Sequence, residues 1–222
     1  MAYSIAIDGP AGAGKSTIAK ETARRLGYIY VDTGAMYRAM ALYMIRQGID
    51  PTDEEMVCAH CKEAKITIQY EDGVQQVILN GENVNGLIRT EEVGKGASSV
   101  ARYKDVRLQL VELQRELART ENVIMDGRDI GTYVLPDADC KIYLTASVEA
   151  RGQRRYLELT EKGVECDMQE IMKDIEARDR QDMGRSFAPL RQAEDAVLLD
   201  TSDMNVENVI AEVLRLFEEK IA

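Results

Sequence analysis

Residues 9–16 read Gly-Pro-Ala-Gly-Ala-Gly-Lys-Ser and match the pattern G-x-x-x-x-G-K-[ST]. An apolar run ends just before them at Asp8, and helical spacing begins at Lys15. Glycines let consecutive backbone N–H groups converge on phosphate oxygens, and the N-terminus of a helix adds a favourable dipole. The segment therefore predicts a strand, a loop that binds a nucleoside triphosphate, and a helix. The alternative is a glycine-rich turn that only caps the helix.

Short apolar runs alternate with segments of helical spacing along most of the chain. Five runs read as strands, at residues 3–8, 28–31, 123–126, 141–144 and 196–199. Helices are expected at residues 15–26, 33–47, 53–64, 90–102, 104–119, 148–161, 168–183 and 206–221. Apolar strands separated by helices are typical of a parallel sheet covered on both faces. The predicted fold class is therefore α/β, with a five-stranded parallel sheet covered by helices.

One stretch breaks this alternation. Residues 65–70 and 75–79 are rich in β-forming side chains and flank the turn at residues 71–73, which predicts a hairpin. A polar loop with two glycines follows at residues 80–86. We therefore expect a small inserted subdomain at about residues 61–98, within a core made of residues 1–60 and 99–222.

Length and charge narrow the class of function. A chain of 222 residues suits one domain, or one domain with a small insert. Its 28 basic and 39 acidic residues give a net charge of −11, which excludes non-specific coating of nucleic acid or of an anionic membrane. No apolar run approaches the ~20 residues of a membrane span, and no signal-peptide pattern is present. We expect a cytoplasmic protein, and a monomer because no long exposed apolar stripe is evident.

The chain has four cysteines, Cys58, Cys61, Cys140 and Cys166. A cytosolic protein keeps its thiols reduced, so no disulfide is expected. Cys58 and Cys61 form a C-x-x-C pattern, but a zinc site would need two further ligands. A helix that carries two small apolar residues is the simpler interpretation.

The triphosphate could serve two broad classes of protein. A switch or motor would hydrolyse it, whereas a kinase would pass its γ-phosphoryl group to a small acceptor. The guanine-reading pattern N-K-x-D is absent from the sequence. Eighteen arginines stand against ten lysines, and the arginine fork suits phosphate better than the lysine ammonium. The arginine excess favours a kinase.

Several arginines occupy positions where a ligand is expected. Ligands of such sheets bind at the carboxyl ends of the strands. The strand at residues 123–126 ends in Asp126-Gly127-Arg128-Asp129. Arg38 lies about one turn into the helix that follows the strand at residues 28–31. Two further groups occur at helical spacing: Arg178, Asp182 and Arg185, and Arg151, Arg154 and Arg155. They either contribute to a ligand site or form solvated salt bridges on a helix surface.

Four motifs together resemble the bacterial cytidylate kinase family. They are Ile7-Asp8-Gly9-Pro10-Ala11-Gly12-Ala13-Gly14-Lys15-Ser16-Thr17, Asp32-Thr33-Gly34-Ala35-Met36-Tyr37-Arg38, Asp126-Gly127-Arg128-Asp129-Ile130-Gly131-Thr132 and Ala188-Pro189-Leu190. They occur in order over nearly the whole chain. The resemblance implies a P-loop nucleoside monophosphate kinase fold with a core, an acceptor-binding insert and a lid at about residues 151–165. It also implies transfer of the γ-phosphoryl group of ATP to CMP or dCMP, giving CDP or dCDP in pyrimidine metabolism.

The resemblance also implies roles for individual residues. The ATP phosphates would be held by Gly9, Pro10, Ala11, Gly12, Ala13, Gly14, Lys15, Ser16 and Thr17, with Ser16 as a ligand of Mg²⁺. CMP would be bound by Thr33, Arg38, Ser98, Arg107, Arg128, Asp129, Arg178 and Asp182, where Ser99 is the alternative to Ser98. The catalytic cations would be Lys15, Arg128, Arg178 and Arg185, and Arg155 is a further arginine of the lid.

The chemistry of cytosine is consistent with these roles. Asp129 can accept a hydrogen bond from the exocyclic amine, while Arg107 or Ser98 donates to the ring. Uracil has a carbonyl in place of that amine, which would face the carboxylate unfavourably. We therefore expect CMP and dCMP to be preferred over UMP. A related small-molecule kinase and an NTP-hydrolysing regulatory protein are the alternatives.

Overall fold

The computed structural model describes residues 2–222, which divide into two compact units. The flanking unit contains residues 3–28 and 124–222. The middle unit contains residues 29–123 together with Ala2.

The main sheet has five strands in the order β2-β6-β1-β7-β8. Their bounds are β1 Ser4–Asp8, β2 Ile29–Asp32, β6 Val123–Gly127, β7 Cys140–Thr145 and β8 Val197–Asp200. β1 pairs in parallel with β7, where Ile5 lies opposite Cys140, and β7 pairs in parallel with β8. Ile5, Ala6 and Ile7 have no exposed surface, as expected for a strand covered on both faces. The predicted five-stranded parallel sheet is confirmed.

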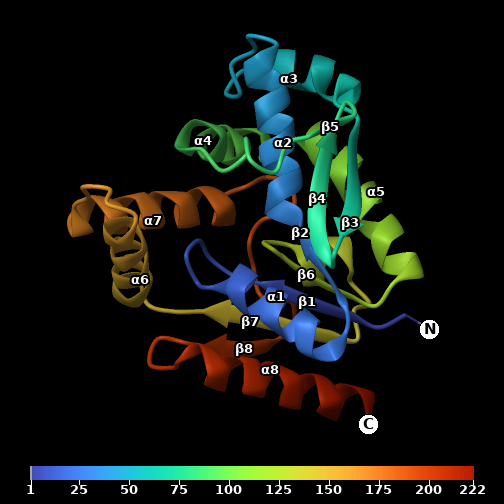
Figure 1. Cartoon of the computed structure of the whole chain (residues 1–222), viewed down its shortest axis with the longest axis vertical. Coiled ribbons are helices and arrows are strands. Elements are labelled where there is room, and N and C mark those ends of the chain that lie inside the picture. Colours follow the sequence, from blue (N-terminus) through green and yellow to red (C-terminus); the bar gives the residue numbers. More distant parts are fainter. Residues whose placement is uncertain (1) are drawn as a thin grey trace. The chain divides into compact units, whose positions relative to one another are not determined.

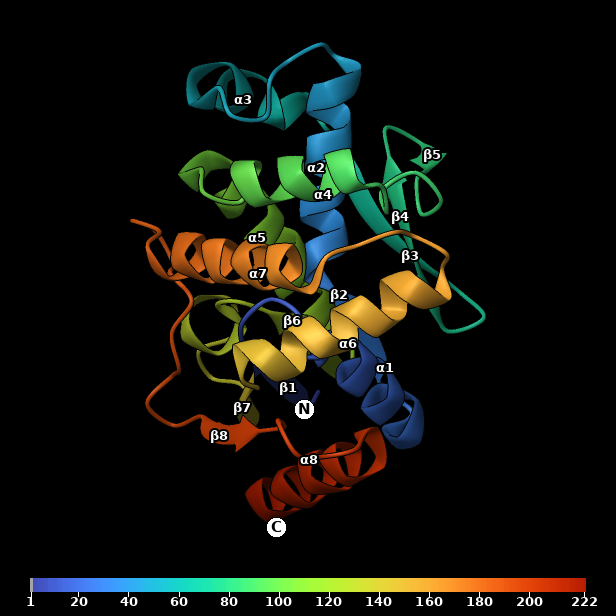
Figure 2. The same ribbon diagram turned by 90° about the vertical axis from the view of Figure 1, so that its left-hand side faces the viewer.

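Four α-helices belong to the flanking unit: α1 Lys15–Leu26, α6 Val148–Glu161, α7 Met168–Met183 and α8 Val206–Ile221. α8 packs against α1 and β7 through an apolar face that includes Val213 and Phe217 (Figure 1). The rings of Tyr3 and Tyr28 meet Phe217 edge-on, each with centroids 5.8 Å apart. α6 and α7 pack against each other and are joined by a loop, as Figure 2 shows.

The middle unit is built around α2 Thr33–Arg46. Met36, Met40 and Met44 of this helix are fully buried, and α2 packs against α4, α5 and the strands β3 and β4 (Figure 1). The remaining elements are α3 Glu54–His60, a 3₁₀ turn Cys61–Glu63, β3 Ile66–Glu71, β4 Val74–Leu79, β5 Glu82–Asn83, α4 Glu91–Val100 and α5 Lys104–Thr120.

The predicted hairpin is confirmed. β3 and β4 pair antiparallel, with Ile66 opposite Leu79 and Glu71 opposite Val74. Asp72 and Gly73 both have positive φ, 50° and 75°, which is the geometry that Asp-Gly adopts in two-residue hairpin turns. β5 then pairs with β4 and completes a three-stranded sheet. The predicted insert at residues 61–98 lies within this unit.

Most predicted boundaries agree with the structure, and a few differ. The helix expected at residues 53–64 is an α-helix only over Glu54–His60, and the 3₁₀ turn follows it. α7 ends at Met183, so Arg185 lies beyond the helix that was expected to carry it. β5 and the short π-helix Ile130–Val134 were not predicted, because two and five residues are too few to show a period.

No helix within residues 2–222 combines the length and apolar character needed to cross a membrane. All four cysteines are free thiols. Cys61 is buried, and its thiol donates a hydrogen bond to the carbonyl of Cys58 at 3.4 Å.

Candidate active site

The glycine-rich loop joins β1 to α1 in the flanking unit. Gly9 is the position where only glycine fits, since a Cβ there would lie 1.9 Å from the backbone oxygen of Leu144 on β7. The first turn of α1 carries no acidic residue, so nothing on the helix offsets the positive end of its dipole. Gly12, Gly14, Ser16 and Thr17 are exposed, whereas Ala11, Ala13 and Lys15 are buried. The exposed positions leave this helix N-terminus open to an anion.

Lys15 is folded back beneath the loop. Its ammonium donates a hydrogen bond to the carbonyl of Pro10 at 2.8 Å. Burial lowers the pKa of Lys15 below its ordinary value, and the positive charge of Arg128 lowers it further. A bound polyphosphate would add negative charge and favour the charged form of Lys15.

Ser16 and Asp126 place two oxygen atoms side by side. The Ser16 hydroxyl donates to Oδ2 of Asp126 at 2.8 Å, from the first turn of α1 to the buried end of β6. Within residues 2–222, no cluster of three or more histidine, cysteine or acidic side chains could hold a metal ion alone. Mg²⁺ nevertheless fits this pair, because it prefers oxygen ligands and is commonly bound through one or two carboxylates plus substrate phosphates. Asp126 had no role in the sequence prediction.

Asp182, near the end of α7, joins two of the predicted arginines. Its Oδ2 accepts from Nε of Arg128 at 2.6 Å, and its Oδ1 accepts from Arg185. Burial would raise the pKa of Asp182, but Arg128 and Arg185 hold it below the ordinary value. Burial alone would lower the pKa of Arg128, whereas Asp182 raises it above the ordinary value.

Arg178 lies one turn before Asp182 on α7. Its pKa is lowered by loss of surrounding water and by the repulsion of Arg128. Arg128, Arg178 and Arg185 thus bring three positive charges together around Asp182, with Asp126 and Asp179 nearby. Such a cluster suits a ligand with several negative charges.

A second ion pair holds the phosphate loop itself. Arg151 of α6 and Asp179 of α7 are both buried and lie 2.7 Å apart, from Nη1 to Oδ2. Asp179 also accepts from the N–H of Ala11 at 3.2 Å, and Arg151 donates to the carbonyl of Ala11 at 2.8 Å. Both polar groups of Ala11 are therefore engaged by side chains. The sequence showed Arg151 only as one arginine among three at helical spacing.

The other two arginines of that group have different partners. Arg154 binds Thr201, through the hydroxyl at 3.2 Å and through the carbonyl. Arg155 pairs with Glu158 at 2.8 Å, and both side chains are exposed. In this structure Arg155 therefore forms a solvated salt bridge on the helix surface, which was the alternative to a ligand-binding role.

In the middle unit, Asp32 organises the start of α2. Its side chain caps the helix by accepting from the N–H of Ala35 at 2.9 Å. Its Oδ2 also accepts from Arg38 and Arg89, each at 2.9 Å. Thr33, the first residue of α2, is buried beside it. Arg38 is thus held in place by a carboxylate, and Nε of Arg38 is buried without a hydrogen-bond partner.

Arg107 and Ser98 belong to the same unit. Arg107 is buried on α5, donates to the carbonyl of Ala101 at 3.0 Å, and stacks on the ring of Tyr37 with its Cζ 5.4 Å from the centroid. The hydroxyl of Ser98 donates to the carbonyl of Gly94 at 3.4 Å, and the neighbouring Ser99 does the same to Lys95. Asp129, of the flanking unit, is buried at the start of the π-helix.

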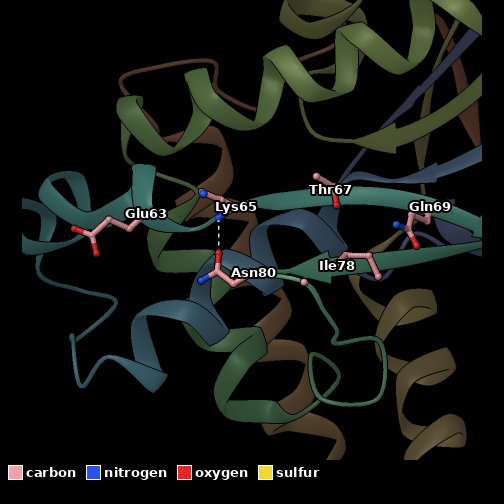
Figure 3. A pocket seen from close by; sticks show the side chains of 7 residues that line it. Glu63, Lys65, Thr67, Gln69, Ile78 and Asn80 are labelled. Atoms are coloured by element: carbon pink, nitrogen blue, oxygen red, sulfur yellow. Dashed lines mark hydrogen bonds between the residues drawn. The ribbon is translucent and has the colours of Figure 1, made fainter.

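A hollow on the middle unit contains none of the predicted site residues. Its lining comes from the 3₁₀ turn, the hairpin β3–β4 and the turn after it, and includes Glu63, Lys65, Thr67, Gln69, Ile78 and Asn80 (Figure 3). At one end of the hairpin, the side chain of Asn80 accepts from the N–H of Lys65 at 2.8 Å (Figure 3). The side chains form no concentrated positive charge, so the hollow lacks the features of a phosphate site.

Comparison with solved structures supports the fold. A gluconokinase from Sinorhizobium meliloti 1021 is 13% identical, with a TM-score of 0.51 over 98% of this chain and 92% of that one. An uncharacterized protein from Eubacterium ventriosum is 10% identical, with a TM-score of 0.56 over 97% of this chain and 98% of that one.

Sequence comparison assigns the family. The family model for cytidylate kinase matches residues 5–219. A cytidylate kinase from Caldicellulosiruptor bescii is 50% identical over 96% of this chain and 95% of its own length. One from Desulfitobacterium hafniense is 50% identical over 98% and 93%, and one from Lactobacillus gasseri is 48% identical over 97% and 94%. The chain therefore belongs to the cytidylate kinase family of phosphotransferases.

Proposed function

We propose that this chain transfers the γ-phosphoryl group of ATP to CMP or dCMP, giving CDP or dCDP. The observation that carries the proposal is the flanking unit's combination of a glycine-rich loop, the Ser16–Asp126 oxygen pair and the arginines around Asp182. A loop alone would bind a nucleotide, whereas the arginine cluster offers charge stabilisation for a group in transfer.

ATP would bind along residues 9–17. Gly12, Gly14, Ser16 and Thr17 are the exposed positions of this loop, and Lys15 would exchange the Pro10 carbonyl for phosphate oxygen. Ser16, with Asp126 behind it, would hold Mg²⁺. When bound, Mg²⁺ neutralises charge on the phosphate oxygens.

The acceptor is already an anionic phosphate, so no strong general base is required. Catalysis then consists of positioning and charge stabilisation. Arg128, Arg178 and Arg185 would neutralise the transferring group together with Lys15, while Asp182 keeps Arg128 and Arg185 oriented. Arg38, held by Asp32, would bind the phosphate of CMP.

Asp129 would read the exocyclic amine of cytosine. The residue is buried, so a hydrogen bond made there is not replaced by water if the wrong base binds. Arg107, Ser98 and Thr33 would complete the CMP contacts, with Asp182 near the ribose. We also propose that the protein acts as a monomer in the cytoplasm, where its four free thiols stay reduced.

The first test measures diphosphate formation from ATP, Mg²⁺ and each of CMP, dCMP, UMP, AMP and GMP. We expect rapid formation of CDP and dCDP and little product from the other acceptors. Efficient use of AMP or GMP would contradict the assignment of CMP and dCMP as acceptors, but not the assignment of kinase activity. Release of ADP without any dependence on an acceptor would contradict the proposed function.

Replacing Asp129 by alanine tests the reading of the base. The variant loses the acceptor for the cytosine amine, so kcat/KM for CMP should fall at least about tenfold while that for UMP changes little. Steady-state kinetics with both acceptors measures the CMP/UMP ratio. An unchanged ratio would refute the role of Asp129, even if both rates fell together.

A further inference from the structure

Asp8 is a buried carboxylate at the end of β1, directly before the glycine-rich loop. Its Oδ1 accepts from the N–H of Ile130 at 2.8 Å, and its Oδ2 accepts from the N–H of Gly131 at 2.7 Å. Both oxygens are thus used on two consecutive backbone groups more than 120 residues away in sequence. Asp8 is itself fixed by the sheet, where it lies opposite Tyr143 in the β1–β7 register.

The two N–H groups open the π-helix Ile130–Val134, which begins immediately after Asp129. Asp129 gives this helix no side-chain cap. The Asp129 carbonyl accepts from the N–H groups of Tyr133 and Val134, at 2.9 and 3.1 Å. The main chain of Asp129 is therefore held from within the π-helix, and the next two residues are held by Asp8. A carboxylate is needed for this, because only an ionised one offers two acceptors and no donor.

Other charged and titratable groups lie around the Asp8 carboxylate and its two hydrogen bonds. Asp129 and Lys15 lie close enough to shift the titration of Asp8 in opposite directions. Lys141 of β7 passes beside Gly131, and its ammonium is bound by Asp195. Burial, which outweighs the two hydrogen bonds, raises the pKa of Asp8 to about 7.

We propose that Asp8 is a positioning residue for base recognition: its two hydrogen bonds fix the start of the π-helix and thereby the placement of Asp129. The inference rests on the proposed function, because it assigns Asp8 a role in the choice between CMP and other acceptors. Both oxygens of Asp8 are engaged by the main chain, so its effect on base recognition runs through the position of Asp129.

The test is Asp8→Asn, which keeps the shape of the side chain. An amide has one oxygen, and its NH₂ group would face a backbone N–H, so one of the two hydrogen bonds is lost. We expect kcat/KM for CMP to fall about tenfold or more and the CMP/UMP ratio to narrow at least about fivefold. Loss of the Asp8 charge near Lys15 affects the reaction with CMP and with UMP alike, so it cancels in the ratio. Asp139→Asn is the matched control, because Asp139 likewise accepts a backbone N–H of β1, that of Ser4 at 2.8 Å, at the other end of the strand.

A second measurement uses the wild-type protein. The CMP/UMP ratio of kcat/KM should rise as the pH increases through about 7, because only ionised Asp8 accepts both N–H groups. Titration of Lys15 and of the acceptor phosphate affects both substrates alike and cancels in the ratio. In Asp8→Asn the ratio should no longer depend on pH, while Asp139→Asn should follow the wild type.

The outcomes separate this inference from the proposed function. A wild-type protein that does not phosphorylate CMP would refute the function before Asp8 is considered. If the wild type prefers CMP, an Asp8→Asn variant of lowered thermal stability but unchanged CMP/UMP ratio would overturn the positioning role. If that variant does not fold, Asp8→Glu replaces it, because the longer side chain keeps a carboxylate but moves both oxygens away from the N–H groups of Ile130 and Gly131; an unchanged CMP/UMP ratio in that variant would overturn the positioning role equally.

Discussion

Replacing Gly9 by alanine should cost more stability than a typical single substitution. The added Cβ would lie 1.9 Å from the backbone oxygen of Leu144, and its three nearest atoms all belong to the Leu144 backbone, so no flexible side chain could move aside. Either β1 or β7 must shift, at the position where the glycine-rich loop leaves the sheet. We expect the free energy of unfolding to fall by about 4 kcal/mol, measured by urea denaturation, and ATP affinity to fall with it.

Gly27→Ala is the control for this prediction. Gly27 ends α1 with a φ of 68°, and a Cβ there would meet nothing within 4 Å. It therefore isolates the backbone cost of a left-handed residue, roughly 1 kcal/mol. If both variants lost the same stability, the close approach of Gly9 to β7 would not be the cause.

Asp179→Ala should destabilise the flanking unit and weaken ATP binding together. The substitution leaves Arg151 buried without its carboxylate partner and frees the N–H of Ala11. Breaking a buried pair from one side costs about 3–5 kcal/mol, a large part of the stability of a protein of this size. Urea denaturation measures the first effect, and equilibrium dialysis with labelled ATP measures the second.

The matched control, Glu158→Ala, removes two ion pairs between exposed side chains. Glu158 pairs with Arg155 at 2.8 Å and with Lys162 at 2.6 Å. Exposed pairs contribute little, so Glu158→Ala should change stability by less than about 1 kcal/mol. An Asp179→Ala variant as stable as Glu158→Ala, with normal ATP affinity, would show that the Arg151–Asp179 pair does not hold the loop.

The sequence predicts the regular elements well where a pattern is long enough to be periodic. The bounds of α1, α6, α7 and α8 agree with the structure because each has twelve or more residues, which is long enough for helical spacing to be recognised. The strand order of the sheet has no such local signal. β5, with two residues, and the π-helix, with five, arise from pairing and capping by other segments.

The candidate site shows the same division. The glycine-rich loop and the arginines stand in short motifs, so their residues could be named from sequence. The carboxylates that hold them could not be assigned partners. Asp126 reaches Ser16 across 110 positions, and Asp179 reaches Ala11 across 168. Only the fold brings these pairs together.

The position of the ion pairs that hold α6 and α7 also determines which end of this helical pair is free to move. Arg151 lies in the first turn of α6, while Asp179 and Asp182 lie toward the end of α7, so the Arg151–Asp179 and Arg128–Asp182 ion pairs are both at one end of the helical pair. The other end of the pair, where residues 162–167 connect the two helices (Figure 2), lies away from these ion pairs. At 1.5 Å per residue α6 is about 21 Å long, so a tilt of about 10° at its base displaces that tip by roughly 4 Å. A tilt of the helical pair would therefore move residues 162–167 the most and the ion pairs at the other end the least.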